Sequence, residues 1–198
     1  MIMRLKIAFL LFLTAYQIQA QDYYMQNGDQ VILDNGLVRR VLSFSGDSIQ
    51  TTFFGLTNDT IGVSLSSKDF SFTINDELLS GFSEWVFLGT SPIQDSSNGK
   101  GVQIDLQSKT TRLKVSLNFL LYPDLPLIRK WITFQNIGKP ILKLERLNVE
   151  DLDTRFSFIQ SVVHHNYGRM KHLGQYVRNW DDPVVVVHDI SQRMGMAL

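Results

Sequence analysis

The stretch "RLKVSLNFLL", residues 112–121, decides the fold class because apolar and polar side chains alternate along it. The apolar set consists of Leu113, Val115, Leu117, Phe119 and Leu121, and the polar set consists of Arg112, Lys114, Ser116 and Asn118. Successive side chains of a β-strand point to opposite faces of its sheet. The pattern therefore predicts an antiparallel strand with one face in a core and one face in water.

The same alternation recurs along the chain. It is clear in "GVQIDLQ", residues 101–107, and in "FSFTI", residues 70–74, where Ser71 and Thr73 occupy the expected wet face. Further candidate strands cover residues 37–44, 48–55, 84–90, 127–134, 141–150, 155–163 and 183–189. We find no persuasive helical stripe of apolar residues after the N-terminal segment. Many strands at close spacing, several of them long, predict an all-β sandwich or barrel with large sheets.

Turn signals separate these strands. "DNG" at 34–36 and "NG" at 98–99 predict turns, because Asn and Gly tolerate positive φ. "YPDLP" at 122–126 and "NIGKP" at 136–140 should break the chain between long strands, and we expect the two prolines of the first to prevent ladder pairing there. "VVVVHDISQRMGMAL", residues 184–198, predicts a hairpin around "DISQ". Its apolar end leads us to expect that the chain is part of a longer protein.

The N-terminal segment predicts secretion. Residues 1–20, "MIMRLKIAFLLFLTAYQIQA", contain Arg4 and Lys6, then a short apolar run, then a polar stretch that ends in Ala20. This order is typical of a secretory signal peptide, and the apolar run is shorter than the roughly 20 residues that span a bilayer. We therefore expect a secreted or periplasmic protein without a membrane span, whose residues 21–198 form one domain.

Charge and cysteine content exclude several classes of function. The chain has 19 Lys plus Arg residues, 19 Asp plus Glu residues and no Cys. A neutral balance gives no electrostatic reason to expect nucleic acid as a partner. The absence of Cys removes thiolate nucleophiles, thiolate zinc sites and disulfides, so burial of apolar side chains must stabilise the domain.

Charged residues at positions 39–40 and 129–130 should point to opposite faces of their strands. Arg39 and Arg40 point to opposite faces, so at most one of them faces a pocket. Arg129 shares a face with Trp131, whereas Ile128, Lys130, Ile132 and Phe134 share the other face. We expect Arg129 to pair with a carboxylate such as Asp124 rather than with a ligand.

Three stretches together carry a family resemblance: "LDNGLVRRVLSF" at 33–44, "YPDLPLIRKWITFQNIG" at 122–138 and "HNYGRMKHLGQYVRNWDDPVVVVHD" at 165–189. In order and spacing they resemble the N-terminal domain of secreted bacterial α-galactosidase-like proteins, the melibiase group of glycoside hydrolase family 36. The resemblance covers residues 31–198. It implies a large antiparallel β-supersandwich, similar to galactose mutarotase, that packs on a (β/α)8 catalytic barrel absent from this chain and contributes to oligomer contacts.

The polar stretch at residues 164–183 is the candidate sugar site. A sugar needs aromatic faces for its apolar side and planar polar groups for its hydroxyls. Trp180 and Asp181 are the first candidates for substrate binding, followed by Asp182, His165 and Tyr167. The resemblance implies that such loops help to form the wall of an α-galactoside pocket. The alternative is a loop whose aromatic residues only pack against another domain or subunit.

Catalysis by the chain alone is not expected. Asp181 and Asp182 are neighbours, so they project to opposite sides and make a poor carboxylate pair. The resemblance implies that both catalytic carboxylates come from the barrel. The histidines, with His164 beside His165, do not predict a metal site, and we expect no cofactor. Two other functions stay open, namely a free-standing carbohydrate-binding module and a mutarotase-like epimerase, although neither Glu145 nor Glu150 can be placed opposite a histidine.

Overall fold

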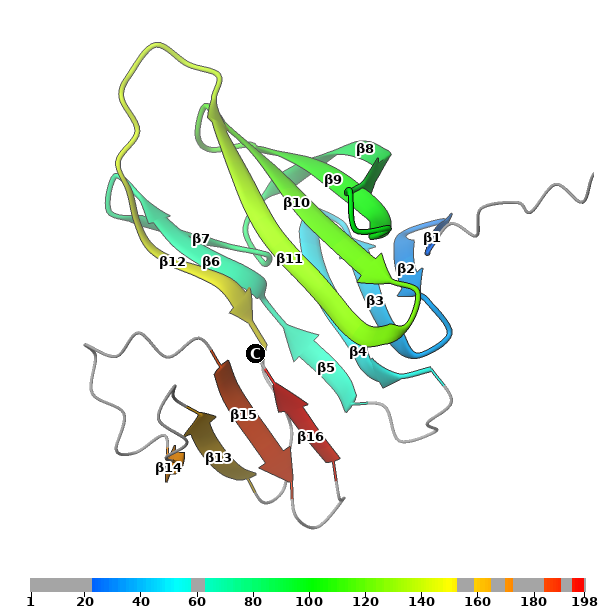
Figure 1. Cartoon of the computed structure of the whole chain (residues 1–198). Coiled ribbons are helices and arrows are strands. Elements are labelled where there is room, and N and C mark those ends of the chain that lie inside the picture. Colours follow the sequence, from blue (N-terminus) through cyan, green and yellow to red (C-terminus); the bar gives the residue numbers. More distant parts are fainter. Residues whose placement is uncertain are drawn as a thin grey trace, which may run out of the picture.

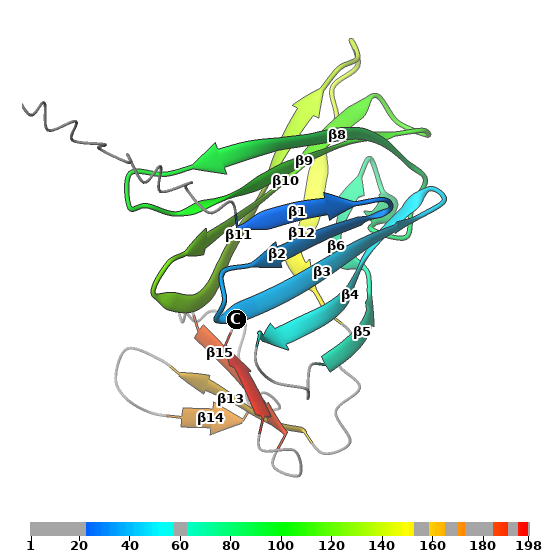
Figure 2. The same cartoon turned by 90° about the vertical axis from the view of Figure 1, so that its right-hand side faces the viewer.

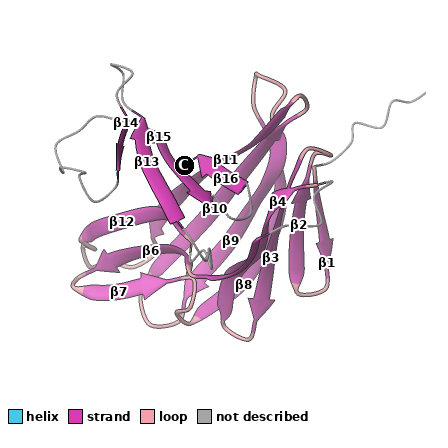
Figure 3. Cartoon of the chain, turned by 90° about the horizontal axis from the view of Figure 1, so that it is seen from below, coloured by secondary structure: helices cyan, strands magenta, loops and turns pink. Residues whose placement is uncertain are grey.

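The computed structural model describes residues 23–57, 63–152, 159–164, 170–172, 184–189 and 194–197. All of the regular structure in these residues is β-strand, and every pair of strands is antiparallel (Figures 1 and 3). The all-β prediction is therefore confirmed. No helix in this part of the chain has the length and apolar character to cross a membrane.

The strands form four sheets. The first sheet has the order β1-β2-β3-β4-β5, with bounds Tyr24–Asn27, Gln30–Asp34, Val38–Ser45, Ser48–Leu56 and Val63–Ser67. The second has the order β11-β10-β9-β8, with bounds Leu125–Asn136, Leu113–Tyr122, Lys100–Ser108 and Trp85–Gln94. The third has the order β12-β6-β7, with bounds Leu144–Asp151, Asp69–Ile74 and Glu77–Ser80. The fourth has the order β14-β13-β15-β16, with bounds Met170–His172, Ile159–His164, Val184–Asp189 and Met194–Ala197.

Short hairpin turns fix the register of the strands. Gly28 and Gly46 follow the last residues of β1 and β3 and have φ of 56° and 59°, the positive value that tight hairpins need at this position. In the turn between β6 and β7, Asn75 and Asp76 have φ of 46° and 68°. Asn and Asp are the non-glycine residues that best tolerate this region, so the local sequence specifies each turn.

The predicted turns at 34–36 and 98–99 are confirmed. Gly36 has φ of 85°, and its backbone N–H donates to Asp34 Oδ1 over 2.8 Å. The Asn35 amide donates to the carbonyls of Tyr122 and Leu125 over 2.6 and 2.9 Å, so this turn is tied to the end of the second sheet. The predicted hairpin around "DISQ" is also found, because Asp189 pairs with Met194.

The expectation for "YPDLP" is wrong in part. Tyr122 pairs with Leu125, so Pro123 and Asp124 form a tight turn and pairing starts again directly after it. Only Pro126 lies where the register of β10 and β11 shifts, a position that needs no ladder donor. β11 therefore begins at Leu125 and runs to Asn136.

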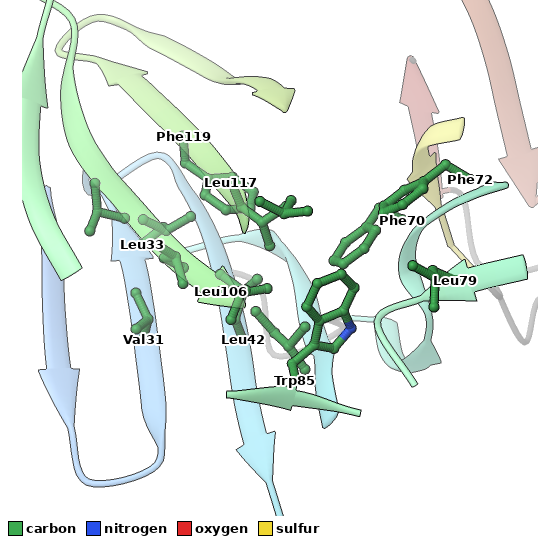
Figure 4. Close-up of a cluster of buried hydrophobic side chains, with 14 of the residues drawn as sticks. Val31, Leu33, Leu42, Phe70, Phe72, Leu79, Trp85, Leu106, Leu117 and Phe119 are labelled. Carbon is green, nitrogen blue, oxygen red and sulfur yellow. The ribbon is translucent and has the colours of Figure 1, made fainter. Parts of the chain in front are cut away.

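The first and second sheets face each other across the core (Figures 2 and 4). Alternate residues of the facing strands are buried, including Val31, Leu33, Val38, Leu42 and Ile49 from the first sheet and Val102, Ile104, Leu106, Val115, Leu117 and Phe119 from the second. The third sheet extends this core, because Phe70 and Phe72 of β6 pack against Trp85 of β8.

The strand β6 departs from the expected pattern. All of its residues are buried, including Ser71 and Thr73, which were expected on a wet face. β12 runs along one of its edges, and side chains of β12 satisfy the polar groups: Ser71 Oγ donates to Asp151 Oδ2 over 2.7 Å and accepts from Asn148 Nδ2 over 2.9 Å. Alternation thus identified the strand correctly but not the burial of its second face.

Phe72 is the residue on which the packing of β6 depends. Its ring lies 4.9 Å from that of Phe134 on β11 and 6.4 Å from that of Trp85 on β8, measured between ring centres. We expect Phe72→Ala to lower the free energy of unfolding by about 3–5 kcal/mol, because it opens a cavity between two sheets. Phe82→Ala, at a site 47% exposed, should change it by less than about 0.5 kcal/mol. Urea unfolding of both purified variants measures the difference, and equal effects would contradict this account of the core.

Candidate functional site

Four ionised side chains meet inside the sandwich. Arg40 comes from β3, Asp69 from β6, Lys130 from β11 and Glu150 from β12, so the group joins the first three sheets. We call it the ion cluster. The side chains of Arg40, Asp69 and Lys130 are 1%, 0% and 4% exposed, and only Glu150, at 22%, reaches solvent. This is the densest concentration of buried charge among the residues that the structure describes.

The alternation of each strand places the two cations in the interior. Arg40 lies between Val38 and Leu42 on the buried face of β3. Lys130 lies between Ile128 and Ile132 on the face of β11 that packs against the core, as the sequence predicted. Arg39, the neighbour of Arg40, is on the opposite face and 41% exposed, 3.8 Å from Asp34. The prediction that the two arginines face opposite ways is confirmed.

The hydrogen bonds within the ion cluster use nearly all of its donors. Arg40 donates through Nη1 and Nη2 to both carboxylate oxygens of Glu150, over 2.8 and 2.6 Å, and through Nη2 to Asp69 Oδ1 over 2.5 Å. Its Nε donates to Thr51 Oγ1 over 3.0 Å, and this hydroxyl donates to Asp69 Oδ1 over 2.5 Å. The charged groups are therefore paired and oriented, as buried ions require.

The amino group of Lys130 is surrounded by acceptors. Nζ donates to the backbone carbonyl of Asp69 over 2.6 Å, to Asp69 Oδ2 over 2.9 Å and to Glu150 Oε1 over 3.2 Å. Three acceptors need three protons, which favours the ammonium form, although burial lowers the pKa of Lys130 below its ordinary value. The cations also lie over aromatic faces: the guanidinium carbon of Arg40 is 5.2 Å from the ring centre of Phe119 and 5.5 Å from that of Phe54.

The electrostatics favour the ionised form of Asp69. Burial alone would raise the pKa of this carboxyl, but the positive charges of Lys130 and Arg40 and the hydrogen bond from Thr51 outweigh it and hold the pKa below its ordinary value. For Arg40, burial opposes the charge, and the attraction of Asp69 and Glu150 raises the pKa above the ordinary value. Two cations and two anions thus balance each other inside the sandwich.

This arrangement is suited to holding sheets together and not to acid–base chemistry. A glycosidase needs one carboxyl that can donate a proton and one free carboxylate across the scissile bond. Here Asp69 and Glu150 are both neutralised by the same two cations, and all four of their carboxylate oxygens accept hydrogen bonds. Glu150 is one of the two glutamates considered as the acid or base of an epimerase. Both of its carboxylate oxygens therefore already accept hydrogen bonds from Arg40. The other, Glu145, pairs with Lys143 over 2.9 Å at the surface.

The sequence contained a signal for this cluster. Arg40 and Lys130 both interrupt runs of core-facing apolar residues, and a charge at such a position requires a buried partner. The identity of the partners was not predictable, because Asp69 and Glu150 lie 29 and 110 residues from Arg40. The expected pair of Arg129 with Asp124 is wrong: Arg129 is exposed, and its guanidinium carbon lies 5.4 Å from the ring centre of Trp131.

The residues predicted to bind sugar, Trp180, Asp181, Asp182, His165 and Tyr167, lie outside the described residues, as does the predicted signal peptide, residues 1–20. Three histidines are placed only by their strands: His164 on β13, His172 on β14 and His188 on β15. Within the described part of the chain, no three His, Asp or Glu side chains gather as a metal site would require.

Comparisons with protein-family models, with curated proteins and with solved structures gave no match to the chain. The resemblance to the melibiase group therefore rests on the sequence motifs alone.

Removing one member of the ion cluster should leave an unpaired buried charge. We expect Arg40→Met to lower the free energy of unfolding by about 3–5 kcal/mol, because Asp69 and Glu150 would then share only Lys130. Arg39→Met on the opposite face should cost less than about 1 kcal/mol, since its pair with Asp34 is partly exposed. Chemical unfolding followed by circular dichroism compares the two variants. Equal losses of unfolding free energy would show that the buried ion pairs stabilise the protein no more than the exposed pair does.

The lowered pKa of Asp69 predicts a dependence of stability on pH. A group whose pKa falls on folding contributes stability above its unfolded value, here 3.8, and loses it as the pH falls toward the folded value. We expect the wild-type protein to lose stability steeply below about pH 4. Asp69→Asn should be less stable at pH 7 and should lose less on acidification. Asp47→Asn, which removes an exposed partner of Lys109, should keep the wild-type slope. Identical acid slopes for Asp69→Asn and wild type would refute the assignment.

Proposed function

We propose that this chain is the N-terminal, non-catalytic domain of a secreted α-galactosidase-like glycoside hydrolase. In this proposal the sheets form a β-supersandwich similar to galactose mutarotase, and a separate (β/α)8 barrel carries the catalytic carboxylates. Residues 1–20 direct secretion, or export to the periplasm. Trp180 and Asp181, with Asp182, His165 and Tyr167 behind them, would help to form the wall of the α-galactoside pocket.

The observation that carries the proposal is a set of exposed apolar side chains on two edge strands and the segment between them, called the apolar row. β11 is the last strand of the second sheet and β12 is the last strand of the third. On these strands and the segment between them, six leucine and isoleucine side chains are at least 40% exposed: Leu125, Leu127, Ile137, Ile141, Leu144 and Leu147. Ile141 is 90% exposed. Exposed apolar side chains that gather in one patch mark protein interfaces, and the six on these strands are the candidate surface for packing against a second domain.

The ion cluster supports the non-catalytic part of the proposal. The carboxylates that the described structure brings together are locked in ion pairs with Arg40 and Lys130. Neither carboxylate is available to attack a sugar or to protonate a leaving group. If the parent protein cleaves α-galactosides, the catalytic pair must come from the barrel, and the resemblance then implies two-step hydrolysis with retention of configuration.

The proposal predicts that hydrolysis requires residues beyond this chain. Sequencing the gene past codon 198 should reveal a frame that encodes alternating strands and helices. The protein made from the longer frame should release nitrophenol from p-nitrophenyl α-galactoside, and the purified chain alone should not. The proposal would fail if no such frame exists, or if the chain alone were active and lost activity on changing one of its own acidic residues.

The apolar row provides a second measurement on the longer protein. Leu127→Asp combined with Leu147→Asp should lower its activity and thermal stability, because charge would then enter the domain interface. Met25→Asp combined with Leu88→Asp is the matched control, since these side chains are 55% and 48% exposed on β1 and β8, and β8 is the edge of the second sheet opposite β11. Equal effects of the row variant and the control would show that another surface holds the barrel.

A further inference from the structure

The outer face of the second sheet carries a set of ordered polar side chains. The strand register places Gln103 of β9, Asn118 of β10 and Trp131 of β11 directly beside one another in one row. The next row contains Asp105, Ser116 and Thr133. The opposite face of the same strands holds Val102, Ile104, Leu117 and Phe119 in the core, so these rows face outward.

Hydrogen bonds hold the polar groups of this face in place. Asp105 Oδ1 accepts from Ser116 Oγ over 2.6 Å and from Gln103 Nε2 over 3.0 Å, and Oδ2 lies 3.3 Å from Lys114 Nζ. Burial would raise the pKa of Asp105, but these donors outweigh it and lower the pKa below its ordinary value. The result is a fixed carboxylate on a rigid strand, with its charge balanced by Lys114.

The base of this face consists of side chains that are almost completely buried. Asn118 is 3% exposed, and its amide donates to the carbonyl of Ser116 over 3.0 Å and to the carbonyl of Trp131 and Thr133 Oγ1 over 3.4 Å each. Leu120, on the same outward side, is 2% exposed. The side chains above these residues therefore stand on a packed base, and their orientation costs little to fix when a ligand binds.

An aromatic ring borders the polar rows. Trp131 is half-buried on the edge strand β11, and the guanidinium carbon of Arg129 lies 5.4 Å from its ring centre. Both side chains point outward, because Lys130 between them points into the ion cluster. An indole face next to a guanidinium, an amide and a carboxylate combines an apolar surface with directional donors and acceptors.

We propose that Gln103, Asp105, Arg129 and Trp131, which stand above the buried Asn118, form a binding face for an oligosaccharide. A sugar ring would stack its C–H face on the indole of Trp131, while its hydroxyls hydrogen-bond to Gln103, Asp105 and Arg129. A long saccharide suits the site, because the polar rows run across three neighbouring strands. This face lies within the described residues and does not depend on the proposed parent enzyme.

The test is affinity electrophoresis of the full chain in native gels that contain galactomannan, xylan or soluble starch. The wild-type protein should be retarded by at least one of these polymers. Trp131→Ala should weaken this binding at least about tenfold, as the loss of a central aromatic contact does in other interfaces. Arg129→Gln should weaken it as well, and because Arg129 is exposed this variant should fold normally. Phe82→Ala, which removes an exposed aromatic side chain elsewhere, should bind like wild type.

Circular dichroism of each variant shows whether the fold is retained. Absence of retardation by all three polymers would overturn the proposal, as would retention of wild-type binding by folded Trp131→Ala and Arg129→Gln. Loss of binding in Phe82→Ala to the same extent would also overturn it. These outcomes leave the proposed parent enzyme untouched, because a hydrolase domain can pack on its barrel with or without a sugar-binding face.

Discussion

The buried group of Arg40, Asp69, Lys130 and Glu150 is the constraint on which the arrangement of the sheets depends. Removing an ion from water costs several kcal/mol even after relaxation, so three buried ions and a partly exposed fourth are tolerated only when their charges and hydrogen bonds match closely. Each ion here comes from a different strand, and together they connect three sheets. A shift of any one strand would leave a charge without its partner. The cluster therefore selects one relative placement of β3, β6, β11 and β12 over others that apolar packing alone would allow.

The same cluster fixes the register of a long strand at the edge of its sheet. β11 runs from Leu125 to Asn136 at the end of its sheet, and such an edge invites pairing with another chain. Lys130 points inward from the middle of this strand to Asp69 and Glu150. A slip of one residue in register would move the ammonium to the other face and leave two carboxylates facing Arg40 alone. An inward charge on an edge strand thus favours the native register and disfavours the alternatives.

The sequence predicts the local part of this structure well and the non-local part poorly. Alternation at 112–121 and the turn residues at 34–36 depend on neighbours in the chain, so strands and hairpins follow from them directly. The burial of Ser71 and Thr73 depends on β12, whose residues Asn148 and Asp151 lie far along the sequence. The pairing of Arg40 with Asp69 and Glu150 depends on how three sheets come together. Periodicity specifies which face of a strand is apolar, but not which distant side chain will meet a charge placed there.

The inner face of β11 stabilises the fold, whereas its outer face carries two residues of the proposed binding face. Its inner face holds Lys130 with Ile128, Ile132 and Phe134, which pack against the core, so those residues are fixed by the demands of burial. Its outer face presents Arg129 and Trp131, whose change would not open the core. A strand with a tightly constrained interior side can hold its exterior side chains in a fixed orientation, which is what a flat recognition surface requires. The packing and ion pairs on the inner face of β11 therefore hold the strand that carries Arg129 and Trp131, as the proposed binding face requires.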